Sequence, residues 1–309
     1  MNHVRTAWRI LGRNLRWVCD VNASRKVEVL QVSKDIPFTT DVDEALEHED
    51  VEAVIIATPA ETHFSLARRA LERDKHILVE KPMTLLSSET KELITIASAR
   101  AKTLMVGHVL LYHPAIVALK KNLGEGRIGR LQYIYSNRLN LGAIRSEENI
   151  LWSFAPHDIS VIQGLTEAIP EVVDAKGASF LQRSIEDTTL TYLRYPDNVH
   201  AHIFVSWLHP FKEQRLVVIG DKGMLVFEDS APLEKLKFYP KGFKHVGGKF
   251  EKFDSNYEVI PFAHKEPLEE ELRHFFHCVT SGSQPLTDGH HALTVLEILE
   301  KAQARLRDP

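Results

Sequence analysis

Hydrophobic and polar positions in the first third of the chain alternate between two periods, one typical of buried strands and one typical of amphipathic helices. Short apolar runs predict strands over residues 15–21, 51–57, 76–80 and 104–107. Apolar residues three or four positions apart predict helices over 4–11, 41–48, 58–73 and 88–101. The third helix begins with Thr58 as cap and Pro59 at the first position. Repeated strand–helix units of this kind predict a doubly wound parallel sheet.

After about residue 112 the pattern changes to extended segments separated by turns. We expect helices over 114–123, 157–165 and 292–306, and strands over 130–139, 172–180, 188–195, 199–207, 215–220 and 224–228. The residues Gly220 to Gly223 predict a hairpin between the last two strands. This pattern predicts an α+β domain with a largely antiparallel open sheet. We therefore expect an α/β protein with a nucleotide-binding domain over 1–112 and a second domain over 113–309.

The composition restricts the class of protein further. The chain has 309 residues, of which 44% are hydrophobic and 26% charged, as is usual for a globular protein with full cores. A formal net charge of −4 gives no reason to expect nucleic acid or an anionic membrane as partner. Two cysteines, Cys19 and Cys278, lie far apart without metal-ligand spacing, so we expect no disulfide, no metal site and a cytoplasmic location.

The segment Val79-Glu80-Lys81-Pro82 closes the predicted strand 76–80. Open parallel sheets bind ligands at the carboxyl ends of their strands, and the proline restrains the backbone of Lys81. A surface lysine in an ordinary strand-to-helix turn is the alternative interpretation of this segment alone. The neighbouring motifs therefore decide between the two.

Asp20 ends the predicted strand 15–21. In a dinucleotide-binding unit such an acid accepts hydrogen bonds from the adenosine ribose and repels a 2′-phosphate, which favours NAD over NADP. Alternatively, Asp20 is a solvated turn residue. The glycine-rich phosphate loop is expected about 20 residues before this acid. It is absent from the sequence, so we expect a chain truncated by a misassigned start, or one that has lost its first strand and this loop.

Several motifs occur in an order that resembles the Gfo/Idh/MocA oxidoreductases. They are Thr58-Pro59 with His63, Glu80-Lys81-Pro82, Gly107-His108 and His157-Asp158. The segment from Asn149 to Ser160, together with Arg138 and Pro285-Leu286-Thr287-Asp288-Gly289, is similar to the branch that acts on nucleotide-activated amino sugars. The combination extends over nearly the whole chain and is more specific than any one motif.

The resemblance implies a role for each matching residue. The cofactor would contact Asp20, Asn22, Thr58, Pro59, His63, Glu80, Lys81 and His108. Lys81 would hydrogen-bond the reacting hydroxyl, and His157 would remove or return its proton, in keeping with a base that titrates near neutrality. The substrate would contact Lys81, Arg138, Asn149, His157 and Asp158. Taken singly, His157 is a packing or helix-start residue, His63 a helix-surface residue, and Arg138 and Asn149 loop ties.

The predicted function is NAD(P)-dependent hydride transfer at a sugar hydroxyl or ketone, at position 3 of a nucleotide-linked amino sugar. One alternative is a non-catalytic sugar-nucleotide-binding or scaffolding paralogue that has lost cofactor binding. Another is a dehydrogenase of free polyols or aldoses. The broad sheet of the second domain needs cover, so we expect a homodimer or homotetramer.

Overall fold

The computed structural model describes residues 1–307, which form two compact units. Unit 1 consists of Met1–Tyr112 and Lys265–Leu296; unit 2 consists of His113–His264 and the chain from Glu297 onward. The sequence analysis expected domains over 1–112 and 113–309, and these bounds stay a prediction. Residues Lys265–Leu296 cluster with Met1–Tyr112 in unit 1.

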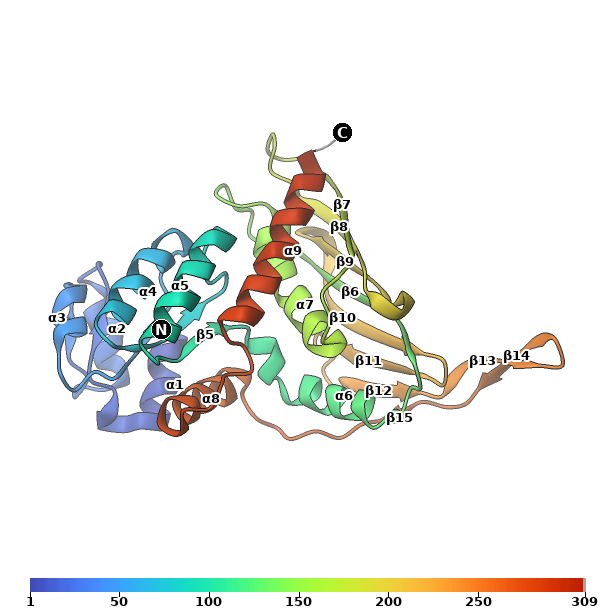
Figure 1. Ribbon diagram of the computed structural model, residues 1–309, viewed down its shortest axis with the longest axis horizontal. Coiled ribbons are helices and arrows are strands. Elements are labelled where there is room, and N and C mark those ends of the chain that lie inside the picture. The colour runs from blue at the N-terminus through green and yellow to red at the C-terminus, as the bar shows by residue number, and fades with distance from the viewer. Residues whose placement is uncertain (308–309) are drawn as a thin grey trace. The chain divides into compact units, whose positions relative to one another are not determined.

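Unit 1 has an α/β architecture with short parallel strands (Figure 1). Its elements are α1 (Asn2–Leu11), β1 (Val18–Cys19), α2 (Arg25–Val32), β2 (Phe38–Thr39), α3 (Val42–Glu47), β3 (Ala53–Ile56), α4 (His63–Glu72), β4 (His76–Glu80), α5 (Ser87–Ala99), β5 (Leu104–Gly107), α8 (Pro267–Ser281) and the first part of α9 (Gly289–Arg307). All strand pairs in it are parallel, which confirms the predicted Rossmann-like sheet.

The parallel strands of unit 1 are divided between two sheets, one with the order β1–β2 and one with the order β3–β4–β5. Within residues 1–307 no strand joins the two. The sequence predicted that the strand over 51–57 is buried on both faces, yet β3 is shorter and partly exposed along most of its length. The physical reason is that β3 pairs only with β4 among the described strands.

The start of α4 also differs from the prediction. Thr58 does not cap a helix; it precedes a short 3-10 turn over Ala60–Thr62, and the α-helix begins at His63. The hydroxyls of Thr58 and Thr62 lie 2.7 Å apart, and the Thr62 hydroxyl donates to the carbonyl of Pro59 at 2.7 Å. These contacts use the side chains that would otherwise cap the first turn. Behind the turn, α4 packs Ala67 and Leu71 into the core.

Unit 2 is built on one large sheet. Its elements are α6 (Pro114–Gly124), β6 (Leu131–Leu141), α7 (Ile150–Thr166), β7 (Val172–Ala178), β8 (Thr188–Arg194), β9 (His200–Ser206), β10 (Leu208–Gly220), β11 (Met224–Glu228), β12 (Leu236–Tyr239), β13 (Lys241–Val246), β14 (Lys249–Asp254), β15 (Glu258–Val259) and the last part of α9. The eight strands are ordered β15–β12–β11–β10–β6–β9–β8–β7. Only β6 and β9 run parallel, so the predicted largely antiparallel sheet is confirmed.

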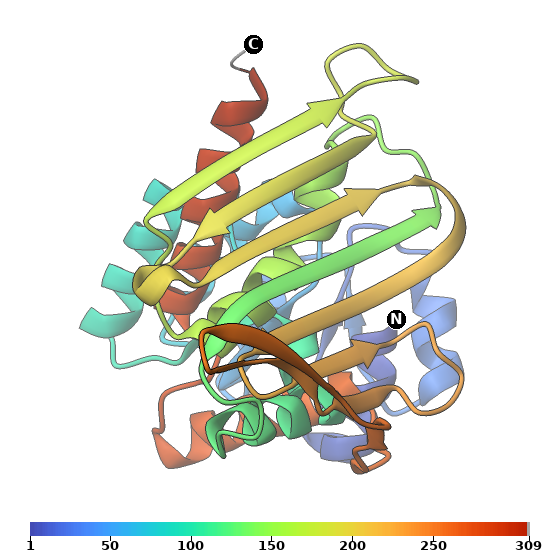
Figure 2. The same ribbon diagram turned by 90° about the vertical axis from the view of Figure 1, so that its right-hand side faces the viewer.

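Helix α7 covers one face of this sheet and is longer than predicted. It begins at Ile150, after Asn149 as N-cap, and continues through Pro156. A proline usually ends a helix, which is why the sequence placed the start at residue 157. The buried side chains of Ile134, Ala201 and Ile203 line the sheet on its core face. Figure 2 shows the opposite face, which no helix of the described chain covers.

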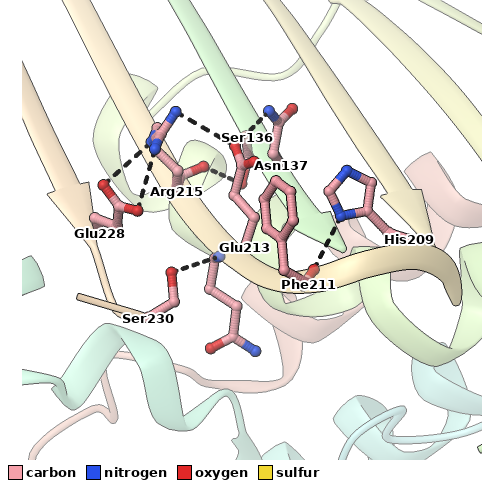
Figure 3. A network of polar contacts seen from close by, with 9 residues as sticks. Ser136, Asn137, His209, Phe211, Glu213, Arg215, Glu228 and Ser230 are labelled. Atoms are coloured by element: carbon pink, nitrogen blue, oxygen red, sulfur yellow. Dashed lines mark hydrogen bonds and ion pairs between the residues drawn. The ribbon is translucent and has the colours of Figure 1, made fainter. Parts of the chain in front are cut away.

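Polar side chains on β6, β10 and β11 form a cross-strand network (Figure 3). Arg215 Nη2 lies 3.1 Å from Glu228 Oε1, and Arg215 Nη1 lies 3.5 Å from Glu213 Oε1. Asn137 donates to the same Glu213 oxygen at 2.9 Å. Because these groups are partly exposed, they contribute to strand register more than to the free energy of unfolding.

Candidate active site

The predicted cofactor residues of unit 1 lie at the carboxyl ends of its strands, three groups of them in the sheet β3–β4–β5 and one residue, Asp20, in the sheet β1–β2. Thr58 and Pro59 follow β3, Lys81 follows β4, and His108 follows β5. The pairing of β3 with β4 and of β4 with β5 brings these three ends to one edge of the sheet. Ligands bind at this edge of open α/β sheets. Asp20 stands at the same end of β1 in the two-stranded sheet.

The Glu80 carboxylate has two polar contacts at this edge. Its Oε1 lies 3.0 Å from His3 Nε2, and its Oε2 accepts a hydrogen bond of 3.0 Å from the backbone N–H of Lys81. Burial raises the pKa of Glu80, but His3 and Lys81 outweigh it and lower that pKa overall. A Cβ on Gly107 would lie 3.2 Å from the carboxyl carbon, so the glycine leaves room for this carboxylate. Glu80 is therefore held as a carboxylate directly before Lys81.

His63 lies behind the same edge and is only 1% exposed. Its Nδ1 is 2.8 Å from the carbonyl oxygen of Pro82, and its Nε2 is 2.8 Å from that of Thr58. The sequence predicted that His63 contacts the cofactor, which stays a prediction. The observed partners are two backbone carbonyls in the segments after β3 and β4.

His108 follows β5 and is also buried. Its ring meets the ring of His291 edge to face, with centroids 5.1 Å apart. Thr287 fastens the late segment of the chain to the same strand, since the Thr287 carbonyl accepts from the Val106 N–H and its hydroxyl donates to the Val106 carbonyl, each at 2.8 Å. The Pro285–Gly289 region, noted in the sequence for its family resemblance, thus belongs beside β5 of unit 1.

Glu271 on α8 is a group that the sequence analysis missed. It is 0% exposed, and neither carboxyl oxygen has a hydrogen-bond partner. Burial, and secondarily the charge of Glu80, raise its pKa well above the ordinary value. The sequence pattern that could have predicted the burial of Glu271 is its position among the apolar residues Leu268, Leu272 and Phe275. This spacing places Glu271 on the buried stripe of a helix.

In unit 2, Asp158 and Arg138 form a nearly buried ion pair. Arg138 donates from Nε to Asp158 Oδ2 at 2.7 Å and from Nη2 to Oδ1 at 3.1 Å. Ser136 also donates to Oδ1, at 2.6 Å. His157, one position earlier on α7, is partly exposed. The structure thus brings Arg138 and Asp158 together. Both oxygens of the Asp158 carboxylate accept hydrogen bonds from residues of unit 2, and contact of Asp158 with substrate stays a prediction.

Asn149 is likewise engaged within unit 2. Its Oδ1 accepts from the N–H of Trp152 at 3.3 Å, and its Nδ2 donates to Gln303 Oε1 at 2.9 Å and to Glu186. Substrate contact by Asn149 stays a prediction, beside this observed role as the N-cap of α7.

Additional charged groups lie near Arg138. Burial raises the pKa of Asp229, but Lys235, with smaller effects of His113 and Arg138, lowers it overall. Nε2 of His113 lies 3.8 Å from Oδ1 of Asp229. Burial is the main cause that lowers the pKa of His113. Unit 2 therefore presents several charges that the sequence analysis did not single out.

The residues of unit 1 fit part of an NAD molecule. Asp20 accepts from the backbone N–H of Asn22 at 2.9 Å with Oδ1, and one carboxylate oxygen remains for ribose hydroxyls. Thr58, Lys81 and His108 lie at the strand-end edge where open α/β sheets bind ligands, and their contact with the nicotinamide half stays a prediction. The glycine turn that holds a pyrophosphate is not found in residues 1–307, so its donors are not represented there. In the same part of the chain, no three His, Cys, Asp or Glu side chains form a metal site, and no helix is both long and apolar enough to span a bilayer.

Comparison with known families agrees with this arrangement. The model of the oxidoreductase family with an NAD-binding Rossmann fold matches residues 2–108, and that of the GFO/IDH/MocA C-terminal domain matches residues 116–226. The chain belongs to the Gfo/Idh/MocA family of oxidoreductases. The first match includes every residue named above at the strand ends of unit 1, and the second includes Arg138, Asn149, His157 and Asp158.

Relatives within the Gfo/Idh/MocA family differ in substrate. The chain is 28% identical to UDP-N-acetylglucosamine 3-dehydrogenase of Acidithiobacillus ferrooxidans over 89% of this chain and 84% of that protein. It is 26% identical to scyllo-inositol 2-dehydrogenase (NAD(+)) of Bacillus subtilis, over 87% and 80% respectively. An uncharacterized oxidoreductase of Synechocystis is 29% identical over 71% of this chain and 65% of its own length.

Solved structures share the fold of the whole chain. UDP-N-acetylglucosamine 3-dehydrogenase GnnA from Acidithiobacillus ferrooxidans superposes with a TM-score of 0.83 and 24% identity over 99% of this chain and 93% of that one. A levoglucosan dehydrogenase in complex with NADH and levoglucosan superposes with a TM-score of 0.82 and 17% identity, covering 98% and 92%. At these identities the likeness concerns the fold.

Proposed function

We propose that this Gfo/Idh/MocA protein oxidises or reduces a ring hydroxyl or ketone at position 3 of a nucleotide-linked amino sugar, with NAD as cofactor. The observation that carries the proposal is Lys81 at the carboxyl end of β4, fixed by the hydrogen bond from its backbone N–H to Glu80. NAD supplies, when bound, the acceptor or donor of the hydride.

The protein's own groups handle the proton and the charge. Lys81 donates a hydrogen bond to the reacting oxygen and stabilises the negative charge that develops on it. His157 accepts the hydroxyl proton during oxidation and returns it during reduction. Asp20 hydrogen-bonds the adenosine ribose and disfavours a 2′-phosphate. The family match over both units supports these roles.

The choice of a nucleotide sugar rests on the relative of Acidithiobacillus ferrooxidans and on the segment from Asn149 to Ser160. A free polyol is the second candidate, supported by the similarity to scyllo-inositol 2-dehydrogenase. The two candidates differ in the charge of the substrate, since only the nucleotide sugar carries a diphosphate.

The test is NADH formation by the purified chain with UDP-N-acetylglucosamine and, separately, with scyllo-inositol. We expect turnover with the first, and a loss of about 100- to 1,000-fold in kcat for Lys81→Ala. The exposed Lys249→Ala is the control and should keep wild-type activity. Turnover with inositol alone would overturn the proposed substrate.

Calorimetric titration with NADH separates the enzyme from a scaffold that has lost cofactor binding. Micromolar binding supports the enzyme. If NADH does not bind but the sugar nucleotide does, the scaffolding role holds and the proposed reaction is wrong.

We also propose that a second copy of the chain covers the helix-free face of the sheet in unit 2. This face carries Leu190 and Tyr192, exposed by 46% and 36%, and the stacked rings of Tyr135 and His202. Sedimentation equilibrium is the measurement, with Leu190→Asp expected to shift the protein toward monomer. A monomer at all concentrations would contradict this assembly.

A further inference from the structure

The ring of His63 occupies a place where sheet hydrogen bonding ends. Strands β3 and β4 are paired up to Ile56 and Val79, after which their chains separate into two loops. The carbonyls of Thr58 and Pro82 belong to these loops, and each lies 2.8 Å from one nitrogen of the His63 ring. The imidazole therefore continues the connection between the two strands beyond their last pair.

Both partners of His63 are carbonyl oxygens, which only accept hydrogen bonds. A ring nitrogen that carries a proton donates to the carbonyl it faces, and the tautomer decides which contact is a hydrogen bond. Because the side chain is 1% exposed, water does not replace either partner.

The two loops are themselves held in place. On one side, Thr62 fixes the turn after β3 through its hydroxyl bond to Pro59. On the other, the buried Thr84 donates to the carbonyl of Leu86 at 2.8 Å and lies 2.7 Å from the hydroxyl of Thr90 on α5. These contacts restrain the segments that carry the two carbonyls.

We infer that His63 is a positioning residue whose ring, placed between the carbonyls of Thr58 and Pro82, holds the two loops and thereby fixes Lys81 relative to the cofactor edge. The inference rests on the proposed role of Lys81. His63 acts through the backbone: Pro82 directly follows the lysine, and Thr58 starts the neighbouring segment. A displacement of a reacting group by about 1 Å can cost on the order of 100-fold in rate.

The first experiment does not depend on activity. Long-range ¹⁵N–¹H spectra of the wild-type protein, with the His63 ring assigned by its contact with Pro82, report how fast the ring N–H protons exchange with solvent. We expect a ring N–H proton of His63 to exchange slowly with solvent, because the ring lies between two carbonyls and is 1% exposed. Exchange as fast as that of an exposed imidazole would overturn the inference, whether or not the protein is a dehydrogenase.

The second experiment tests positioning by a double-mutant cycle of His63→Gln and Lys81→Ala. We expect His63→Gln to lower kcat by about 10- to 100-fold, and the double variant to be no slower than Lys81→Ala alone. His290→Gln, an exposed histidine on α9, is the matched control and should behave as wild type. Multiplying losses in the double variant would show that His63 acts independently of Lys81 and would contradict its role as a positioning residue.

Discussion

Nε2 of His3 lies 3.0 Å from Oε1 of Glu80, so the first turn of α1 is bound to the carboxyl end of β4. Both side chains are mostly buried, with 19% and 28% of their surface exposed. The contact lowers the pKa of Glu80 against the opposing effect of burial. The N-terminal helix thus takes part in the electrostatics of the strand end that carries Lys81.

His3→Ala should raise the pKa of Glu80, because burial then acts with less opposition. Since a lowered folded-state pKa stabilises the protein above the ordinary value of 4.5, the variant should be less stable near neutral pH. The difference from wild type should shrink as the pH falls below that value. Carboxyl ¹³C shifts and urea unfolding measure the two effects.

Arg9→Ala is the matched control on the same helix, since it removes only an exposed pair with Glu269. An unchanged titration of Glu80 in His3→Ala would contradict the expected coupling.

Glu271→Gln should raise the free energy of unfolding by about 1–3 kcal/mol at neutral pH, because the carboxyl is buried without a partner. The folded-state pKa is raised, so wild type loses stability as the pH rises above the ordinary value of 4.5. The advantage of the variant should therefore widen over this range. Urea denaturation at several pH values is the measurement, with the exposed Glu49→Gln as control. A constant difference at all pH values would show that Glu271 does not titrate as expected.

Asp158→Ala should destabilise unit 2 by about 3–5 kcal/mol, because it leaves the Arg138 guanidinium without its partner in a nearly buried site. The double variant Arg138→Met with Asp158→Leu should cost less, since no charge is left behind. Thermal unfolding compares them. Arg273→Ala breaks a more exposed pair with Glu269 and should change stability by at most about 1 kcal/mol. Equal losses in the single and double variants would argue against an uncompensated charge.

Asp20→Ala should reduce the preference for NADH over NADPH, because the carboxylate at the end of β1 repels a 2′-phosphate. We expect the dissociation constant for NADPH divided by that for NADH to fall about tenfold, equivalent to about 1.4 kcal/mol. Calorimetric titration with both nucleotides gives the ratio. Asp35→Ala, which removes an exposed acid paired with Arg13, should leave the ratio unchanged. An unaltered ratio in Asp20→Ala would remove this residue from the cofactor site.

Strands and helices with strong local patterns could be predicted from the sequence. The strands β4 and β5 have the predicted bounds, because short apolar runs between helices leave little choice of structure. Helix α8 was missed although its apolar residues recur at helical spacing. Its membership in unit 1 depends on packing against α1, which no local pattern records.

The parallel topology was enough to predict which residues lie at the strand ends. It was not enough to predict which groups hydrogen-bond to the candidate site residues. His63 and Pro82 are 19 positions apart, and Arg138 and Asp158 are 20 positions apart. Such contacts depend on how loops and side chains fold back, and a single sequence carries no direct signal for them. The buried Glu271 shows the same limit, since its neighbour Glu80 lies far away along the chain.

The return of Lys265–Leu296 to unit 1 has a consequence for how the protein is made. During synthesis the ribosome releases β5 long before Thr287, whose two hydrogen bonds to Val106 fasten the late segment to that strand. Unit 1 therefore cannot complete its fold until almost the entire chain has been synthesised. The strands of the sheet in unit 2 all lie before residue 265, so that sheet can form earlier. We expect nascent chains that end before α8 to expose the surface of α1 that α8 later covers, and to be susceptible to proteases there.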